Sequence, residues 1–62
     1  MKELDVVKLR TDFEGVPAGT VGTIVLEYDG QNFEVEFVDS EGDTIDVLTT
    51  PASILELVVD YK

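Results

Sequence analysis

Apolar and polar residues alternate strictly along the most regular segment of this chain. Residues 33–38 place three apolar side chains on one side of an extended backbone, and Glu34 and Glu36 on the other. Side chains of a β-strand point alternately to opposite faces, whereas an amphipathic helix repeats every 3.6 residues. This period of two therefore predicts a half-buried strand, and a chain built on such segments is a sheet protein.

Four more segments have the short, β-branched or alternating pattern of strands. We expect them at Leu4–Leu9, Thr20–Tyr28, Thr44–Thr49 and Leu55–Val59. Turn residues separate them: a long loop from Arg10 to Ala18, hairpin turns at Asp29–Gly30 and Asp39–Asp43, and a single 3₁₀ or α turn over Thr50–Ile54. Within the second strand, Gly22 suits a bulge or a sharp bend.

Five short strands with that turn before the last one predict an all-β fold. We expect residues 1–62 to form a single domain, a small, partly open, five-stranded SH3-like barrel. The OB-fold is the alternative, but it normally needs a longer chain and a helix between its third and fourth strands. A curled sheet would bury one apolar core, which we predict as Val6, Ile24, Leu26, Phe33, Val35, Phe37, Ile45, Val47, Ile54, Leu57 and Val59.

Charge and length together limit the stability of such a domain. The 62 residues include no Cys and no His, so neither a disulfide nor a zinc site can staple the fold. An apolar content of 44% argues against disorder, although the net charge is −10. We expect moderate salt or mild acidification to raise the melting temperature by weakening charge repulsion, and an unchanged value would contradict a clustered anionic face.

The chain beyond Arg10 is a polyanion. It holds twelve of the fourteen carboxylates, all but Glu3 and Asp5, and no cationic side chain before Lys62. Such a surface repels phosphate backbones and anionic membranes and attracts basic proteins. The lack of His and Cys removes most general-base, nucleophile and transition-metal chemistry. We therefore expect no enzyme activity, no cofactor, no metal site, no nucleic-acid partner and no membrane association.

The segment Pro17–Val25, with its two spaced glycines, resembles the entry to the second strand in KOW-type SH3-like barrels. More widely, Leu4–Val7, Gly19–Val25, Phe33–Asp39 and Leu48–Ala52 together resemble a family of short bacterial proteins of unknown function. That resemblance implies the SH3-like barrel and brings no activity. It also implies a place beside a second small gene, as in toxin–antitoxin or toxin–immunity pairs. The KOW resemblance would imply RNA contact, but here only Lys8 and Arg10 lie together, and acidic residues flank them.

Glu34 and Glu36 are the first candidate contact residues, about 7 Å apart on one face of a strand. Paired glycosidase carboxylates have similar spacing, but no electrophilic partner is evident. A solvated face that keeps a barrel soluble is the ordinary interpretation. Together with Asp46 and Glu27 on the neighbouring strands, the pair could instead form an anionic patch. The Asp39–Asp43 segment has calcium-ligand residue types without EF-hand spacing, so we interpret it as a turn.

Phe13 is the second candidate, because it lies between Asp12 and Glu14 in the long loop. An apolar anchor ringed by charge is typical of an interaction hot spot. With Tyr28 and Tyr61 it could also line a groove for proline-rich peptides, although such grooves usually include Trp, which this chain lacks. The alternative is that Phe13 packs the loop against the core.

These observations predict a small acidic protein-binding module. We expect an antitoxin or immunity protein that covers a basic surface of its partner. The contact set would be Asp12, Phe13, Glu14, Glu34, Glu36 and Asp46. The alternative is an accessory subunit that uses apolar contacts or an edge strand such as Leu55–Val59, which would allow a weak homodimer rather than a monomer. No apolar run suits a signal peptide, so we expect a cytoplasmic location.

Overall fold

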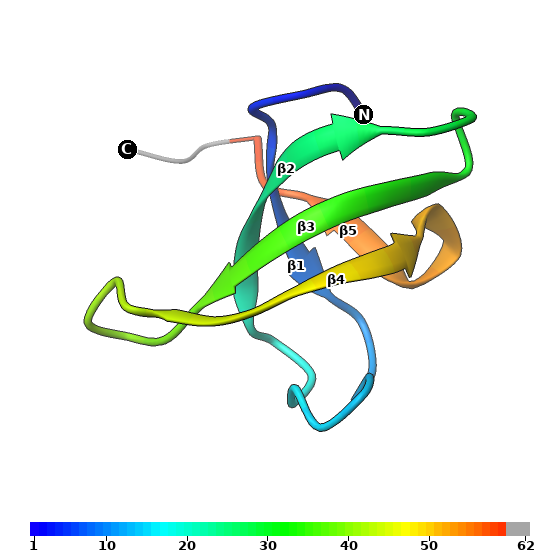
Figure 1. Cartoon of the computed structure of the whole chain (residues 1–62). Helices are drawn as coiled ribbons and strands as arrows, with labels where there is room; N and C mark the ends of the chain where they lie inside the picture. Colours follow the sequence, from blue (N-terminus) through cyan, green and yellow to red (C-terminus); the bar gives the residue numbers. More distant parts are fainter. Residues whose placement is uncertain (60–62) are drawn as a thin grey trace.

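The computed structural model describes residues 1–59 as five strands and one 3₁₀ turn (Figure 1). In chain order these elements are β1 (Val6–Leu9), β2 (Val21–Glu27), β3 (Asn32–Val38), β4 (Thr44–Pro51), η1 (Ala52–Ile54) and β5 (Leu55–Leu57). The predicted all-β class, the five strands and the turn before the last strand are confirmed. β4 extends to Pro51 because η1 begins later than the predicted turn, and β5 ends before Val59.

All five strands form one antiparallel sheet in the order β4-β3-β2-β1-β5. β4 and β5 lie at opposite edges, yet only the three residues of η1 connect them. The sheet must therefore curl on itself, as Figure 1 shows. Within residues 1–59 the two edge strands do not pair with each other, so the curled sheet stays open. β3 runs directly into β4 through a hairpin, without the helix that the OB-fold alternative needs.

The core lies inside the curled sheet and contains side chains from β1, β2, β3, β5 and the β1–β2 loop. It consists of Val7, Leu9, Val16, Ile24, Phe33, Val35, Phe37 and Leu55, with Phe13, Leu48, Ala52 and Ile54 packed against it. The predicted inward residues of β3 and Ile24 of β2 are confirmed. On the other strands, several residues that the sequence placed in the core are not buried, so those predictions are wrong.

The prediction for β1 is wrong because two adjacent valines hide the alternation. Lys8 points away from the core, so Val7 and Leu9 face inward and Val6 is only half-buried. In the C-terminal segment the buried residue is Leu55, whereas Leu57 is 41% exposed and Val59 is 77% exposed. Leu57 pairs with Val7 of β1, but both predicted core residues lie at or beyond the end of an edge strand, which has no described strand on its other side.

On β4, the pairing with β3 reverses the predicted inward face. Phe33 lies opposite Thr50, and Val35 lies opposite Leu48. Directly paired residues share a face, so Thr50 and Leu48 point toward the core. Residues of the other parity therefore point outward, and the predicted core residues Ile45 and Val47 are 45% and 43% exposed.

The sequence predicted a bulge at Gly22, but the bulge in β2 lies three residues later. The register of β2 against β3 shifts between Ile24 and Leu26, which turns the predicted core residue Leu26 outward and leaves it 43% exposed. At Gly22 the register is continuous, and the glycine instead allows β3 to approach closely. A Cβ atom there would lie 2.6 Å from the Cγ1 atom of Val35.

Both predicted hairpin turns are confirmed, and each begins with an aspartate. The Oδ1 atom of Asp29 accepts hydrogen bonds from the backbone N–H groups of Gln31 and Asn32, both at 2.9 Å. These bonds hold the pKa of Asp29 below its ordinary value of 3.8. The Oδ1 atom of Asp39 accepts hydrogen bonds from the backbone N–H groups of Glu41 and Asp43, at 2.9 and 3.0 Å. Its carboxylate therefore closes a turn.

No helix within residues 1–59 is long and apolar enough to cross a membrane.

Candidate functional site

The outward side of β2, β3 and β4 forms one continuous surface, which we call the outer face. Cross-strand pairs put Val21 beside Val38, Thr23 beside Glu36 and Val47, and Leu26 beside Glu34 and Thr49. Thr44 pairs with Val38, and Ile45, the unpaired residue of the bulge between β3 and β4, lines a hollow together with Val21 and Val38 and so adds to the same surface. The outer face therefore consists of Val21, Thr23, Leu26, Glu34, Glu36, Val38, Thr44, Ile45, Val47 and Thr49.

Glu34 is held in place by two hydroxyl groups. Its Oε1 atom accepts hydrogen bonds from the Tyr28 hydroxyl at 3.0 Å and from the Oγ1 atom of Thr49 at 2.9 Å. The bond to Glu34 raises the pKa of the Tyr28 phenol above its ordinary value of 10.0, because deprotonation would remove the donor and place two anions together. The carboxylate of Glu34 thus has a defined position.

Glu36 is held in the same way by a threonine of β4. Its Oε2 atom accepts a hydrogen bond from the Oγ1 atom of Thr44 at 2.5 Å. Both glutamates are half-buried, and the neighbouring Leu26, Ile45 and Val47 are exposed. The outer face is therefore not a uniformly acidic surface. It presents two fixed carboxylates among threonines and exposed aliphatic side chains.

The register does not place Asp46 and Glu27 with the two glutamates. Asp46 pairs with Phe37, and Glu27 pairs with Phe33, so both have the parity of core-facing residues. The Oδ1 atom of Asp46 accepts a hydrogen bond from the backbone N–H of Val47 at 2.8 Å. Asp46 therefore caps backbone on an edge strand and lies outside the outer face.

In the β1–β2 loop, Asp12, Phe13 and Glu14 lie close in sequence but differ in their environment. The Oδ1 atom of Asp12 accepts a hydrogen bond from the backbone N–H of Ala18 at 2.8 Å, which closes the loop. Phe13 is half-buried, packs against the core and forms a bridge with Val16. Glu14 is exposed, with a φ of 51°. The structure thus supports the packing alternative for Phe13.

The groove for proline-rich peptides would need Phe13 together with Tyr28 and Tyr61. Tyr28 follows the end of β2, and its hydroxyl is bonded to Glu34. Phe13 belongs to the loop that precedes β2. Tyr61 lies outside the described residues. Phe13 and Tyr28, the two members of this set that the structure describes, therefore lie on either side of β2 along the chain.

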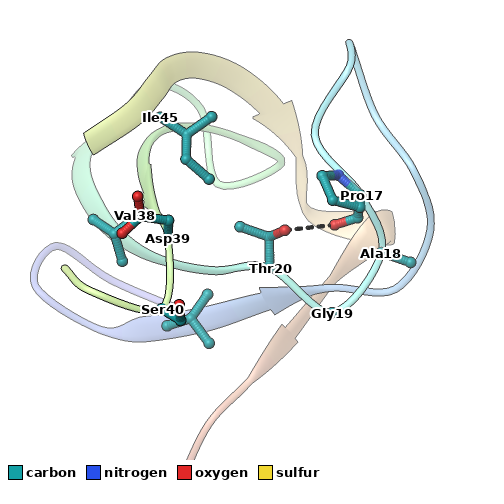
Figure 2. Close-up of a pocket in the computed structure, with 9 residues that line it drawn as sticks. Pro17, Ala18, Gly19, Thr20, Val38, Asp39, Ser40 and Ile45 are labelled. Carbon is teal, nitrogen blue, oxygen red and sulfur yellow. Dashed lines mark hydrogen bonds between the residues drawn. The ribbon is translucent and has the colours of Figure 1, made fainter. Parts of the chain in front are cut away.

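A groove between the β1–β2 loop and the β3–β4 hairpin was not predicted from the sequence. It has a volume of about 530 Å³ and is open to solvent. Figure 2 shows Pro17 and Thr20 on one side, with Val38 and Ile45 facing them from the other. Its lining is Pro17, Ala18, Gly19, Thr20, Val21, Val38, Asp39, Ser40 and Ile45. Their separation in the sequence explains why no local pattern indicated it, although Pro17, Ala18 and Val38 are apolar residues beside turns.

The cationic side chains within residues 1–59 all belong to the N-terminal segment. Lys2 forms an ion pair with Asp5 at 2.8 Å, and that bond lowers the pKa of Asp5 below 3.8. Lys8 lies 4.0 Å from Glu56, and the Nε atom of Arg10 donates to the carbonyl oxygen of Leu55 at 3.2 Å. These contacts are with β5 and the N-terminus, so they leave the glutamates of the outer face uncompensated.

Within residues 1–59, no three acidic side chains converge as metal ligands would. Comparison with curated proteins and with solved structures finds no match. A family model does match almost the whole described chain, and it confirms the predicted resemblance to a family of unknown function. The chain belongs to the family described as "Domain of unknown function (DUF4926)", whose model matches residues 3–57.

Proposed function

We propose that this chain is a protein-binding module whose outer face docks on a basic, partly apolar surface of a partner protein. The observation that carries the proposal is the position of Glu34 and Glu36. Hydrogen bonds to hydroxyl groups fix both carboxylates among exposed aliphatic side chains, and no described residue after Arg10 is cationic.

Two physical effects favour such docking. Leu26, Ile45 and Val47 expose aliphatic surface, and burying it contributes about 25 cal/mol per Å². The glutamate side chains are already ordered, so less rotamer freedom is lost on binding. The net charge of −10 would steer a basic partner toward the module and make association fast and dependent on salt.

The concrete form of the proposal is a cytoplasmic antitoxin or immunity protein that covers the cationic site of a toxin. The resemblance to short bacterial proteins from toxin-like gene pairs supports this form. The finer classification as an SH3-like barrel is also part of the proposal. It is supported by the curled sheet with the strand order β4-β3-β2-β1-β5 and by the 3₁₀ turn before the last strand.

The test begins with the product of the adjacent gene, purified with this chain. Association would be followed by biolayer interferometry at low and moderate salt. Replacing Glu34 and Glu36 together by glutamine keeps hydrogen-bond acceptors and removes two charges. We expect a slower association rate and a weaker salt dependence.

The matched control replaces Glu3 and Glu56 by glutamine, which removes the same charge away from the outer face. If both double variants slow association equally, net charge alone steers the partner and the outer face has no special role. Failure to form any complex with a basic gene product would remove the inhibitor form of the proposal.

A second candidate function is an accessory subunit that binds through an edge strand. The exposed positions of Leu57 and Val59 at the end of β5 favour it, because this edge has no described neighbour. Such a complex would depend on apolar contacts and backbone pairing. It should persist in high salt, whereas a complex through Glu34 and Glu36 should dissociate.

A further inference from the structure

We propose that the groove between the β1–β2 loop and the β3–β4 hairpin binds an extended segment of the partner protein, with an aliphatic side chain in the groove and Lys or Arg on either side. This inference rests on the proposed function and adds the site that recognises the partner's apolar residue. Three features of the groove support this binding: its ordered walls, its aliphatic lining and its acidic surroundings.

One wall of the groove is a loop held by its own hydrogen bonds. The Oγ1 atom of Thr20 donates to the carbonyl oxygen of Pro17 at 2.7 Å. The N–H of Gly19 donates to the carbonyl oxygen of Leu9 at 2.9 Å, which ties the loop to β1. Asp12 closes the other end of the loop through Ala18. This wall is therefore formed before any partner binds.

The opposite wall is the β3–β4 hairpin, which is equally constrained. The N–H of Asp39 donates to the carbonyl oxygen of Asp43 at 2.9 Å, and the N–H of Gly42 donates to the carbonyl oxygen of Asp39 at 3.0 Å. The Asp39 carboxylate adds two further bonds to this turn. Because both walls are already ordered, binding costs little loop entropy.

The lining between the walls is mainly aliphatic, since Pro17, Ala18, Val21, Val38 and Ile45 contribute to it. Surface of this kind binds an apolar side chain. The groove's volume lies within the range of small-molecule sites, but such sites bury most of their ligand, and this groove is open along its length. An extended protein segment fits an open groove better than a small ligand does.

Carboxylates lie on both sides of the apolar lining. Asp39 lines the groove, and Glu41 and Asp43 follow it in the hairpin turn. On the loop side, Asp12 lies beside Pro17 in a neighbouring hollow. Cationic residues on either side of an inserted aliphatic residue would match this pattern, whereas a nucleic acid would be repelled.

The groove is continuous with the outer face, because Val21, Val38 and Ile45 belong to both. Val21 and Val38 form the row next to Glu36 along β2 and β3. A segment anchored in the groove can therefore continue over Glu36 and Glu34. The groove would hold the apolar anchor, and the glutamates would bind the basic residues that follow.

The experiment uses ¹⁵N-labelled protein and two synthetic peptides of equal length. One peptide carries a leucine–valine pair between pairs of lysines, and the other has glycines in place of the leucine–valine pair. Amide shifts are followed by NMR through the millimolar range. We expect the first peptide to shift the amide signals of residues 18–21 and 38–45 in a saturable manner, and the glycine peptide to shift them far less.

Ile45→Ser removes an aliphatic side chain from the groove and should raise the Kd of the first peptide about fivefold. Leu4→Ser is the control, since Leu4 is an exposed aliphatic residue that precedes β1 and lies outside the groove, and it should leave the Kd unchanged. If Ile45→Ser disturbs the fold, Val21→Thr removes apolar character from the lining of the same groove with little change in shape, and it should also weaken binding.

Three outcomes would overturn the groove proposal: equal binding of both peptides, shifts confined to the β3 glutamates, or no saturable binding. The first two would leave the proposed function intact, because they retain an acidic docking surface. The third would also leave it intact if the complex with the adjacent gene product forms and depends on Glu34 and Glu36. The proposed function is contradicted only if the complex with the adjacent gene product does not form, or forms without dependence on Glu34 and Glu36.

Discussion

Gly22 is the position where one added methyl group should damage this fold most. An alanine Cβ there would lie 2.6 Å from the Val35 Cγ1, 2.9 Å from the Glu36 carbonyl oxygen and 2.9 Å from the Phe37 Cδ1. Val35 and Phe37 are fully buried, so neither side chain has open space to move into. The methyl group would therefore push β3 away from β2.

The expected cost follows from these distances. Optimal contacts between carbon atoms are about 3.5–4.0 Å, so β3 or its side chains would have to move by about 1 Å. Overpacking a filled core costs about 1–3 kcal/mol, and two buried side chains and a backbone atom are involved here, so we expect about 3 kcal/mol for Gly22→Ala. A domain of this length has a stability of about 3–9 kcal/mol. The variant should therefore lose between about a third and all of the stability of the fold.

Urea denaturation followed by circular dichroism measures this loss directly. Gly15→Ala is the matched control, because its Cβ would meet nothing within 4 Å, while its φ of 84° still strains an alanine. We expect about 1 kcal/mol for this variant from backbone strain alone. If Gly22→Ala were no more destabilising than Gly15→Ala, the close approach of β3 to β2 would not be a packing constraint.

Three further predictions concern Thr50, Tyr28 and Asp29. Thr50 is fully buried, and its hydroxyl donates to the Leu48 carbonyl oxygen at 3.1 Å. Thr50→Val should therefore change the unfolding free energy by less than about 1 kcal/mol, and Thr50→Ser, which loses a methyl group, should cost more in urea titrations. In a Tyr61→Phe background, ultraviolet titration should give a Tyr28 pKa above 10.0 that falls toward this value in Glu34→Gln; an unchanged pKa would mean that the bond to Glu34 is absent in solution. The pKa of Asp29 is lower in the folded chain than its unfolded value of about 3.8. The stability that its ionised carboxylate contributes is therefore fully present above about pH 3.8 and is lost as the pH falls through the folded-state pKa. The stability difference between Asp29→Ala and the unmodified chain should therefore shrink in acid, and a difference independent of pH would contradict this role.

The strands could be predicted from local pattern, but their inward faces could not always be. β3 has strict alternation, so its buried residues followed directly from the sequence. Ile45 and Val47 alternate just as regularly, yet they point outward because β4 pairs with β3 through Thr50 and Leu48. The facing of a strand depends on the register of its hairpin, and a shift of one residue reverses it. Bulges in both β2–β3 and β3–β4 add such shifts, and no residue type marks them reliably.

The candidate site was predictable to a similar extent. Glu34 and Glu36 could be placed on one face because they flank Val35 in an alternating strand. The hydroxyl groups that hold them come from Tyr28, Thr44 and Thr49, and their positions depend on the pairing of three strands. Asp46 was grouped with the glutamates because it lies on the next strand. However, it pairs with the core-facing Phe37, so it does not share a face with Glu34 and Glu36. Sequence identifies the acidic residues, and register decides which of them share a surface.

The aspartates and glutamates of this chain have different structural roles. Within residues 1–59, five aspartates accept hydrogen bonds from backbone N–H groups: Asp5, Asp12, Asp29, Asp39 and Asp46. A short carboxylate reaches nearby backbone easily, so these residues close turns and cap an edge strand. Much of the negative charge therefore accompanies local geometry that a short chain needs, and the acidic composition alone overstates the surface devoted to binding.

This division of roles can be tested, because asparagine accepts the same backbone bonds without the charge. Replacing Asp5, Asp29 and Asp46 by asparagine, all outside the groove and the outer face, should keep the backbone bonds that these residues accept, while the net charge changes from −10 to −7. Association with a basic partner should then slow modestly, through the weaker long-range field. The Glu34→Gln, Glu36→Gln double variant removes fewer charges and should slow association more, since it also removes direct contacts. If the triple aspartate variant has the larger effect, the partner responds to total charge, and the fixed carboxylates of the outer face do not select it.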